Sequence, residues 1–310
     1  MGEGIYLEKR IVLAGGSGFL GQSLARYLMV RGYMVTILTR GKTAAIDQIE
    51  YIHWDGVRLE DEWARRIDAS YAVVNFTGKS VNCLYTKGNR EEIISSRLAS
   101  IQVLQEAILK SNNPPQVCIQ AGSLAIFGDT TEICHEDSDH GTGFSVDVCE
   151  RWEAAFFKDE WPHTRKVLLR IGFALGDNGG ALGPLQRLAK FNLGGTIGSG
   201  RQYISWLHMD DLNEMFVQAI ENEQYDGIYN ATGPNPVTNK EFMKTLRKVM
   251  NKGWAPPAPA PFVKLGAYII MRADPSLALT GRKCIPKRLQ AEGFQFRHTN
   301  LEGALRDIID

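Results

Sequence analysis

The chain has 310 residues, 44% of them hydrophobic, which suits one large globular unit or two smaller ones. Lys plus Arg and Asp plus Glu number 35 each, so the formal net charge is zero. A chain without a basic excess is a poor candidate for general nucleic-acid binding. No apolar run approaches the length of about 18 residues that indicates a membrane span. We therefore expect a protein that binds neither nucleic acid nor membrane.

The N-terminus and the cysteines indicate the compartment. Residues 1–10 lack the apolar core of a secretory signal. The cysteines are odd in number and have no C-x-x-C spacing, so we interpret them as reduced thiols. They are Cys83, Cys118, Cys134, Cys149 and Cys284. The sequence thus predicts a cytoplasmic protein with no metal site.

The first apolar run leads into a glycine turn. Residues 11–14 predict a buried strand, and 22–30 an amphipathic helix. The stretch between them fits G-x-G-x-x-G and comprises Gly15, Gly16, Ser17, Gly18, Phe19, Leu20 and Gly21. Glycines there allow a sharp turn, contact with a pyrophosphate and close helix packing, and the helix N-terminus attracts the anion. A dinucleotide site is favoured over a plain structural turn.

The end of the second predicted strand, 34–38, indicates which dinucleotide binds. Thr39 and Arg40 follow it and supply no carboxylate for the ribose hydroxyls of NAD. An arginine there suits the 2′-phosphate of NADP, through a charge-assisted bond worth about 1.5–3 kcal/mol. The sequence therefore favours NADP. The alternative is that Arg40 and Lys42 are solvated loop charges.

Strands and helices alternate along the next part of the chain. Further strands are predicted at 51–55, 71–78, 116–121, 166–171, 203–208 and 227–231. Helices are predicted at 90–110, 146–157, 182–191, 209–220, 264–271 and 301–309, and irregular segments at 132–142, 172–183, 194–200 and 254–261. This order predicts an α/β fold, a doubly wound parallel sheet with helices on both faces.

Ligands of such a sheet lie beyond the carboxyl ends of its strands. We therefore expect the residues that end the strand at 71–78 to lie beside the cofactor; they are Asn75, Phe76, Thr77 and Gly78. Arg97, on the helix 90–110, and Gly172, after the strand 166–171, are assigned to the same site. The alternative for Arg97 is an ordinary surface charge.

Short motifs along nearly the whole chain carry a family resemblance. They lie at 15–21, 39–40, 95–97, 152–155, 179–181, 204–212 and 293–296. With them the chain resembles the extended short-chain dehydrogenases, and within these the atypical NADP-binding epimerase-family proteins of unknown substrate. The resemblance implies an NADP-binding Rossmann domain, 1–176 plus about 203–233. It also implies a smaller C-terminal α+β substrate domain, 177–202 plus 234–310.

The resemblance also implies a catalytic Ser or Thr, a Tyr and a Lys. Ser123, just past the strand 116–121, fits the first role. Aligning Glu153 with the family's usual acidic residue puts Ser145 at the tyrosine position and Cys149 at the lysine position. Both the tyrosine and the lysine are therefore missing. Cys149 is a candidate acid/base, because a thiol titrates near 8.5; the alternative is a small buried thiol.

Two residues are assigned to the substrate. Arg201 follows a glycine-rich loop and is a candidate ligand for a substrate phosphate. His208 precedes the helix 209–220 and is a candidate for the substrate cleft, with a satisfied structural histidine as the alternative. Asp210 and Asp211 are expected to cap that helix.

Two functions follow. One is an NADP-dependent oxidoreductase or epimerase-like enzyme acting on a small polar or nucleotide-linked substrate. The other is a non-catalytic NADP(H)-binding regulatory module that kept the fold and lost the Tyr–Lys pair. By analogy with the family, the helices 90–110 and 146–157 are expected to pair in a homodimer.

Overall fold

The computed structural model describes residues 9–310, except 178, 267 and 269–271. Its main sheet contains β1 (Arg10–Ala14), β2 (Met34–Thr39), β3 (Ala44–Ile46), β4 (Ile49–His53), β5 (Ala72–Asn75), β6 (Val117–Ser123), β8 (Arg165–Ile171) and β12 (Gly227–Ala231). The strand order is β12-β8-β6-β5-β1-β2-β4-β3. All neighbours pair in parallel except β3 with β4. The predicted doubly wound parallel fold is confirmed; the antiparallel edge strand was not predicted.

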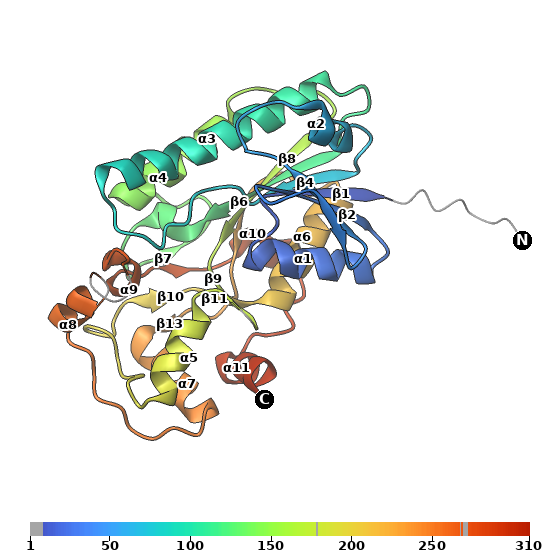
Figure 1. The fold of residues 1–310 in the computed structure, drawn as a ribbon. Helices are drawn as coiled ribbons and strands as arrows, with labels where there is room; N and C mark the ends of the chain where they lie inside the picture. Colours follow the sequence, from blue (N-terminus) through green and yellow to red (C-terminus); the bar gives the residue numbers. More distant parts are fainter. Residues whose placement is uncertain (1–8, 178, 267, 269–271) are drawn as a thin grey trace, which may run out of the picture.

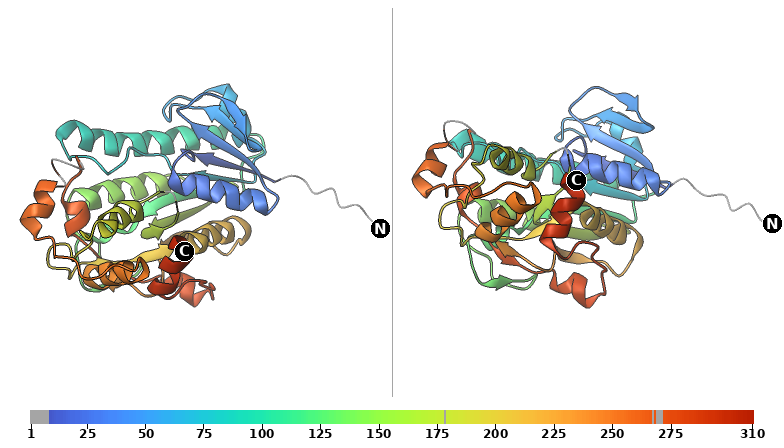
Figure 2. Two further views of the ribbon diagram at one scale, coloured as in Figure 1. Left: turned by 60° about the horizontal axis from the view of Figure 1, so that its bottom comes forward. Right: turned by 90° about the horizontal axis from the view of Figure 1, so that it is seen from below.

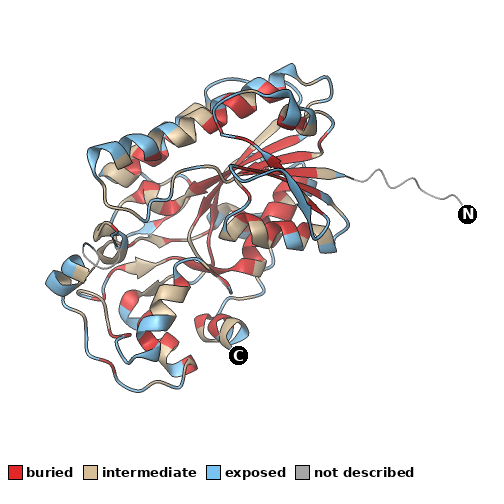
Figure 3. Ribbon diagram, viewed as in Figure 1, coloured by how far each residue is buried: buried red, intermediate tan, exposed pale blue. Residues whose placement is uncertain are grey.

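Helices cover both faces of this sheet (Figure 1). One face carries α1 (Phe19–Val30) and α6 (Met209–Glu221), and the other carries α2 (Asp61–Ile67), α3 (Lys87–Lys110) and α4 (Phe144–Phe157). Along β1, Ile11 and Leu13 belong to the core on the α1 side, whereas Val12 and Ala14 belong to the core on the α3 side. Burial on both faces, visible as red strands in Figure 3, explains why β1 is an unbroken apolar run.

The direction of strand addition reverses at β1. In register, Ala14 lies between Leu38 of β2 and Asn75 of β5. The chain adds strands on the β2 side first and then crosses to the β5 side. Dinucleotides bind at such a switch point, beyond the carboxyl ends of the two central strands. The fold thus places the glycine turn and residues 75–78 at one edge of the sheet.

A second group of elements, the small lobe, has a core of its own. It contains α5 (Leu182–Lys190), α7 (Asn239–Val249), α11 (Leu301–Ile309), the pair β9 (Phe173–Leu175) with β11 (Trp206–His208), and the pair β10 (Tyr203–Ile204) with β13 (Val237–Thr238). In Figure 2, α11 lies at the red end of the chain and packs against α7.

Short elements join the two parts. They are η1 (Leu124–Phe127), β7 (Ile133–Cys134), α8 (Ala260–Gly266), α9 (Ser276–Leu279), β14 (Lys283–Cys284) and α10 (Lys287–Ala291). The strand β14 pairs in parallel with β7, and α10 packs against β12. The C-terminal segment therefore returns to the edge of the main sheet before it reaches α11.

The strand predicted at 203–208 is wrong as one element. It breaks at Ser205 into β10 and β11, which pair with different partners. The Ser205 hydroxyl donates to the Arg282 carbonyl oxygen and accepts from the Cys284 amide, both over 2.8 Å, while the Ser205 carbonyl accepts from the Phe173 amide. These three contacts come from distant segments, so no local pattern announces the break.

Three other predictions need correction, and a fourth lies largely outside the described residues. The stretch 254–261, predicted as extended, contains the start of α8 at Ala260, and α8 ends at Gly266. Of the helix predicted at 264–271, residues 267 and 269–271 lie outside the described residues. The predicted loops 132–142 and 172–183 contain β7 and β9, whose two or three residues are too short to show a period.

Besides the short η1, α9 and α10, two longer helices were not predicted at all. One is α2, a seven-residue helix held by buried Trp63, whose ring lies 5.3 Å from that of Trp54. The other is α7, which starts with a complete capping box formed by Thr238 and Glu241. Among the residues that the structure describes, no helix combines the length and the apolar character needed to cross a membrane.

Candidate functional site

The glycine turn leaves room only for glycine at its packed side. Gly15 has a φ of +69°, and a Cβ there would lie 2.7 Å from Thr77 Oγ1. A Cβ on Gly21 would lie 2.4 Å from both the Cα and the carbonyl oxygen of Gly16. Because these neighbours are mostly backbone, no side-chain rotation makes space. The turn therefore holds α1 against β1 and against the chain beyond β5.

The other side of the turn is open. Gly18 is the N-cap residue of α1, and a Cβ on it would meet nothing within 4 Å. Within the described part of the chain no side chain caps α1, and its first turn carries no acidic residue. Such a helix end offers unpaired amides and a partial positive charge to an anion. Leu20 packs against the main core, whereas Ser17 is exposed, so the backbone of this stretch and the Ser17 hydroxyl are offered to a ligand.

Phe19 links the turn to the glycine-rich loop after β9. A Cβ on Gly179 would lie 2.4 Å from the Phe19 ring, and one on Gly176 would lie 3.0 Å from it. The loop therefore passes directly over the start of α1. The sequence indicated both stretches separately but did not predict their contact, which depends on glycines at positions with no common period.

The end of β2 lies next to the turn. Thr39 Oγ1 donates to Ser17 Oγ and accepts from the Gly41 amide, both over 3.2 Å. Arg40 is exposed, and its side chain forms no hydrogen bond or ion pair with any other residue that the structure describes. Thr39 thus ties the strand end to the turn, while the Arg40 guanidinium is free to bind an anion.

The end of β5 is partly structural. The buried Asn75 amide donates to Gln120 Oε1 over 2.9 Å and to Ser100 Oγ over 3.3 Å. Its side-chain oxygen accepts from the Thr77 amide over 3.0 Å. Asn75 therefore joins β5 to β6 and α3 rather than offering its side chain to a ligand. Thr77 Oγ1 is buried beside Gly15 and has no hydrogen-bond partner among the residues that the structure describes, so it is available to a ligand.

The other residues assigned to the cofactor lie around this edge. The Phe76 ring packs on Phe216 of α6, with centroids 5.3 Å apart. Gly78 faces Arg97, whose Cζ would lie 2.9 Å from a Cβ on Gly78. Gly172 instead separates β8 from β9, and a Cβ there would lie 2.4 Å from the Ser205 carbonyl oxygen. Gly172 is thus a packing glycine.

Ser123 ends β6 and is half-buried. Its Oγ accepts from the Ala125 amide over 3.1 Å and thereby caps η1, which leaves the hydroxyl proton free to donate. The Cys149 thiol lies 3.9 Å from the Ser123 carbonyl oxygen. Burial raises the pKa of Cys149 to about 12, so the thiol stays protonated at neutral pH. This favours the buried-thiol interpretation over an acid/base role.

The two residues assigned to the substrate lie in different surroundings. Arg201 is exposed in the loop before β10, and its side chain forms no ion pair with any other described residue. His208 is buried at the end of β11, and its Nδ1 accepts from the Asp210 amide over 3.1 Å. His208, not an aspartate, therefore caps α6. The structural interpretation of His208 is favoured.

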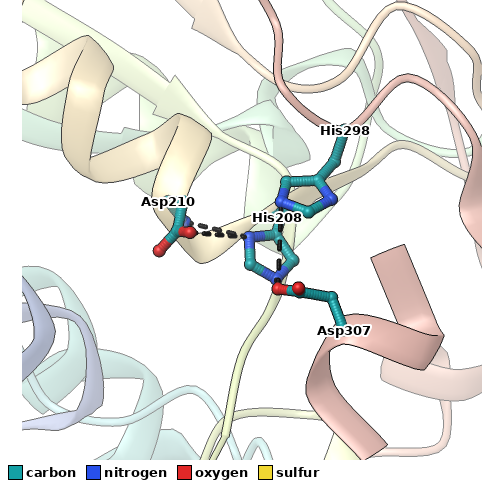
Figure 4. A group of neighbouring side chains, drawn as sticks. All are labelled: His208, Asp210, His298 and Asp307. Atoms are coloured by element: carbon teal, nitrogen blue, oxygen red, sulfur yellow. Dashed lines mark hydrogen bonds and ion pairs between the residues drawn. The ribbon is translucent and has the colours of Figure 1, made fainter. Parts of the chain in front are cut away.

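A cluster of two histidines and two aspartates surrounds this cap (Figure 4). His208 and His298 stack with ring centroids 3.8 Å apart, and His208 Nε2 lies 3.3 Å from a carboxylate oxygen of Asp307. Their ligand atoms and one from Asp210 lie within 4.8 Å of one another. Because Nδ1 of His208 accepts the cap hydrogen bond, a neutral ring carries its proton on Nε2, facing Asp307. The cluster thus suits a proton better than a metal ion.

This cluster makes the stability of the protein depend on pH. Burial lowers the pKa of His208, His298 adds to this, and Asp210, Asp307 and Asp211 oppose it. Below an unfolded-state pKa of about 6.5 the unfolded chain binds the proton that the folded chain refuses. The free energy of unfolding should therefore fall as the pH drops from about 7 towards the lowered folded-state pKa.

The His208→Asn variant should flatten this pH dependence in urea-unfolding curves measured across that window. Asparagine is a good N-cap residue, so the cap survives while the titrating ring is lost. His163→Asn is a matched control, because His163 is exposed and has a φ of +66°, which asparagine tolerates. An unchanged slope in His208→Asn would rule out His208 as the source.

Two structural features near the site were not predicted. Asp211 does not cap α6: its carboxylate accepts from the backbone amides of Arg297 and His298, over 2.7 and 3.1 Å. Arg170 on β8 forms a buried, two-pronged ion pair with Glu153 on α4, over 2.9 and 2.8 Å. Both join segments far apart in the chain, so sequence spacing carried no signal for them.

Two family models match the chain. The "NAD dependent epimerase/dehydratase family" model matches residues 11–145, and the "Domain of unknown function (DUF1731)" model matches residues 258–308. The first covers the glycine turn, the β5 end and Ser123. The second covers the C-terminal elements from α8 to α11.

Named relatives extend over almost the whole chain. The epimerase family protein YfhF of Bacillus subtilis is 33% identical over 307 residues, covering 96% of this chain and 97% of the relative. A chloroplastic SDR39U1 homologue of Arabidopsis thaliana is 30% identical, covering 97% of this chain and 87% of the relative. The crystal structure of human epimerase family protein SDR39U1 with NADPH is 30% identical, with a TM-score of 0.86 over 96% of this chain and 98% of that one. With this identity along its full length and the glycine turn at the switch point, the protein belongs to the epimerase family.

Proposed function

We propose that the protein binds NADP(H) at the carboxyl ends of β1 and β5 and uses it to reduce or oxidise a small polar or nucleotide-linked substrate. The observation that carries the proposal is the open, uncapped start of α1 at Gly18, next to the unpaired Arg40. The backbone amides of the turn suit a diphosphate, and Arg40 suits one further phosphate. Agreement comes from the human relative, which was crystallised with NADPH.

The cofactor would supply hydride transfer, and the chain's own residues would hold the substrate. The Ser123 hydroxyl, whose oxygen already accepts from Ala125, would hold a substrate oxygen by donating a hydrogen bond to it. Arg201 would bind a substrate phosphate from the loop before β10. We further propose a cytoplasmic location, since every cysteine is free, and a homodimer built on α3 and α4.

Arg40 tests the choice of cofactor. Arg40→Ala should weaken NADPH binding about 10–100-fold and leave NADH binding unchanged, because a charge-assisted hydrogen bond is worth about 1.5–3 kcal/mol. The affinity of both nucleotides can be measured by titrating the fluorescence of the reduced nicotinamide.

Lys42→Ala is the matched control, because Lys42 is an equally exposed cation two residues further along the same loop. It should change neither affinity beyond a small screening effect. If Arg40→Ala weakens the binding of NADH and NADPH equally, or weakens the binding of neither, Arg40 is not the ligand of the 2′-phosphate.

One observation favours a second function, a non-catalytic NADP(H)-binding regulatory module. Ser145 and Cys149 occupy the positions of the family's tyrosine and lysine, and Cys149 is buried and protonated. A panel of hydroxyl and carbonyl compounds separates the two functions. Turnover that disappears in Ser123→Ala would exclude the module, whereas tight NADPH binding without turnover on any compound would exclude the enzyme for that panel.

A further inference from the structure

Two buried polar groups beside α4 have no hydrogen-bond partner among the described residues. They are the Tyr85 hydroxyl and Nε of Arg97. No carboxylate pairs with Arg97 in the described part of the chain, and the groups that act on its charge are Cys149 and Tyr85. A buried cation without a counter-charge and a buried hydroxyl without a partner both cost free energy. Their occurrence side by side calls for a functional explanation.

Tyr85 lies against the first turn of α4. Its ring packs edge-on against Phe144, with centroids 4.9 Å apart. Phe144 is the first residue of α4, and the half-buried Ser145 is the next. Tyr85 therefore packs beside Ser145, which influences the pKa of its hydroxyl, and Ser145 stands at the position where relatives with the standard chemistry carry their tyrosine.

Arg97 is held against Trp152 in the third turn of α4 and against the chain beyond β5. Its guanidinium lies 4.8 Å from the Trp152 ring centroid, and its Nη1 donates to the carbonyl oxygens of Lys79 and Ile93 over 3.0 and 2.9 Å. The same group packs on Gly78, where a Cβ would come within 2.9 Å of Cζ. The charge is thus fixed near Cys149, at the position of the family's lysine.

The electrostatics suit proton donation. Burial raises the pKa of Tyr85; Ser145 and Arg97 oppose the rise, while the charges of Asp274 and Cys83 add to it. The phenol is therefore protonated at neutral pH. Arginine keeps its charge in proteins, so the phenolate that remains after donation has a fixed cation beside it.

We propose that Ser145 is a catalytic residue that contacts the substrate oxygen and passes to it a proton from Tyr85, while Arg97 is a positioning residue that stabilises the resulting phenolate. The inference rests on the proposed reductase function. An alcohol is a much weaker acid than a phenol, so Ser145 alone cannot replace a tyrosine. In this arrangement Tyr85, in the segment between β5 and α3, replaces the phenol of the family's tyrosine. Arg97, on α3, replaces the positive charge of the family's lysine.

The proton balance is complete. During reduction of a carbonyl compound, the Ser145 O–H bond breaks as an O–H bond forms on the substrate oxygen, and the Tyr85 proton moves to Ser145. The hydride that completes the alcohol is the contribution of NADPH, which is oxidised as the carbonyl is reduced. Solvent then returns one proton to the Tyr85 phenolate.

Tyrosinate absorbance tests the relay without substrate or cofactor. The difference between wild-type and Tyr85→Phe pH titrations isolates Tyr85, and phenylalanine keeps the packing on Phe144. Tyr85 should ionise above the ordinary value of about 10. The pKa of Tyr85 should rise further in Ser145→Ala and in Arg97→Gln. In Arg97→Lys it should return to the wild-type value. A titration that neither substitution moves would overturn the proposal.

Kinetics supply the second test, with the rate of NADPH oxidation measured on carbonyl compounds that the wild type reduces. Tyr85→Phe and Ser145→Ala should each lower kcat about 10²–10⁴-fold, with NADPH affinity unchanged. A wild type that does not bind NADPH would refute the proposed function. If the wild type binds NADPH and reduces a carbonyl compound, and Tyr85→Phe does so equally fast, only the relay is refuted. Loss of NADPH binding in Arg97→Gln would also refute the relay, because Arg97 would then be a cofactor ligand.

Discussion

Glu153→Ala is expected to lower the free energy of unfolding by about 3–5 kcal/mol, because it leaves a buried guanidinium without its carboxylate. The side chains of Arg170 and Glu153 are only 2% and 9% exposed, and two hydrogen bonds join them. Arg170 also donates to the Glu136 carbonyl oxygen, so its position is fixed and it cannot turn out to solvent. Urea-unfolding curves of the variant and the wild type measure the loss.

Asp147→Ala is the matched control for this prediction. Asp147 pairs with Arg151 over 2.7 Å on the exposed face of the same helix, where the side chains are 44% and 58% exposed. Surface pairs of this kind contribute about 0–1 kcal/mol. A second comparison replaces both buried partners, in Glu153→Leu with Arg170→Met, and should recover much of the loss. A Glu153→Ala protein no less stable than the control would contradict the prediction.

The largest effect on cofactor binding is expected from Gly21→Ala. The new Cβ would lie 2.4–2.6 Å from three backbone atoms of Gly16, so either the turn or α1 must move. Overpacking of this kind costs about 1–3 kcal/mol of stability. Loss of charge-assisted contacts between the amides of the turn and the diphosphate, worth about 1.5–3 kcal/mol, corresponds to a factor of about 10–100 in Kd. NADPH affinity should fall by about that factor, measured by the same fluorescence titration as for Arg40.

Two further glycines separate the causes of this loss. Gly88→Ala, in the first turn of α3 where a Cβ meets nothing within 4 Å, should change neither stability nor affinity appreciably. Gly18→Ala has the same freedom in the fold, but its Cβ stands on the open side of the turn. Gly18→Ala should leave the free energy of unfolding unchanged and weaken NADPH binding. If both Gly18→Ala and Gly21→Ala bind NADPH as tightly as the wild type, the diphosphate does not bind at this turn.

Sequence alone was sufficient for the central sheet and the family. The strands β1, β2, β5, β6, β8 and β12 are short apolar runs because both faces of a parallel sheet are buried, and the runs alternate with helical periods. The glycine turn was recognisable because its spacing follows from local backbone geometry. The domain boundaries and the roles of the site residues remain predictions.

The helix α7 was not predicted, although the sequence contains the pattern that indicates it. Thr238 and Glu241 have the spacing of a capping box, and the buried residues Phe242, Leu246 and Val249 that follow recur at helical intervals. A systematic search for capping boxes would have found α7. The shorter α2 and the two- or three-residue strands offered too few residues for any period to show.

The amino-acid sequence by itself determined the strands β1, β2, β5, β6, β8 and β12, the longer helices other than α7, and the glycine turn, because each depends on residues within a few positions of one another. Only the tertiary structure decided which distant side chains meet: His208 with Asp307, Arg170 with Glu153, and Tyr85 with Phe144. Such meetings depend on how the chain crosses over the sheet, and no local period or propensity encodes them. The groups on which stability and the proposed chemistry depend are therefore those that a linear pattern could not bring together.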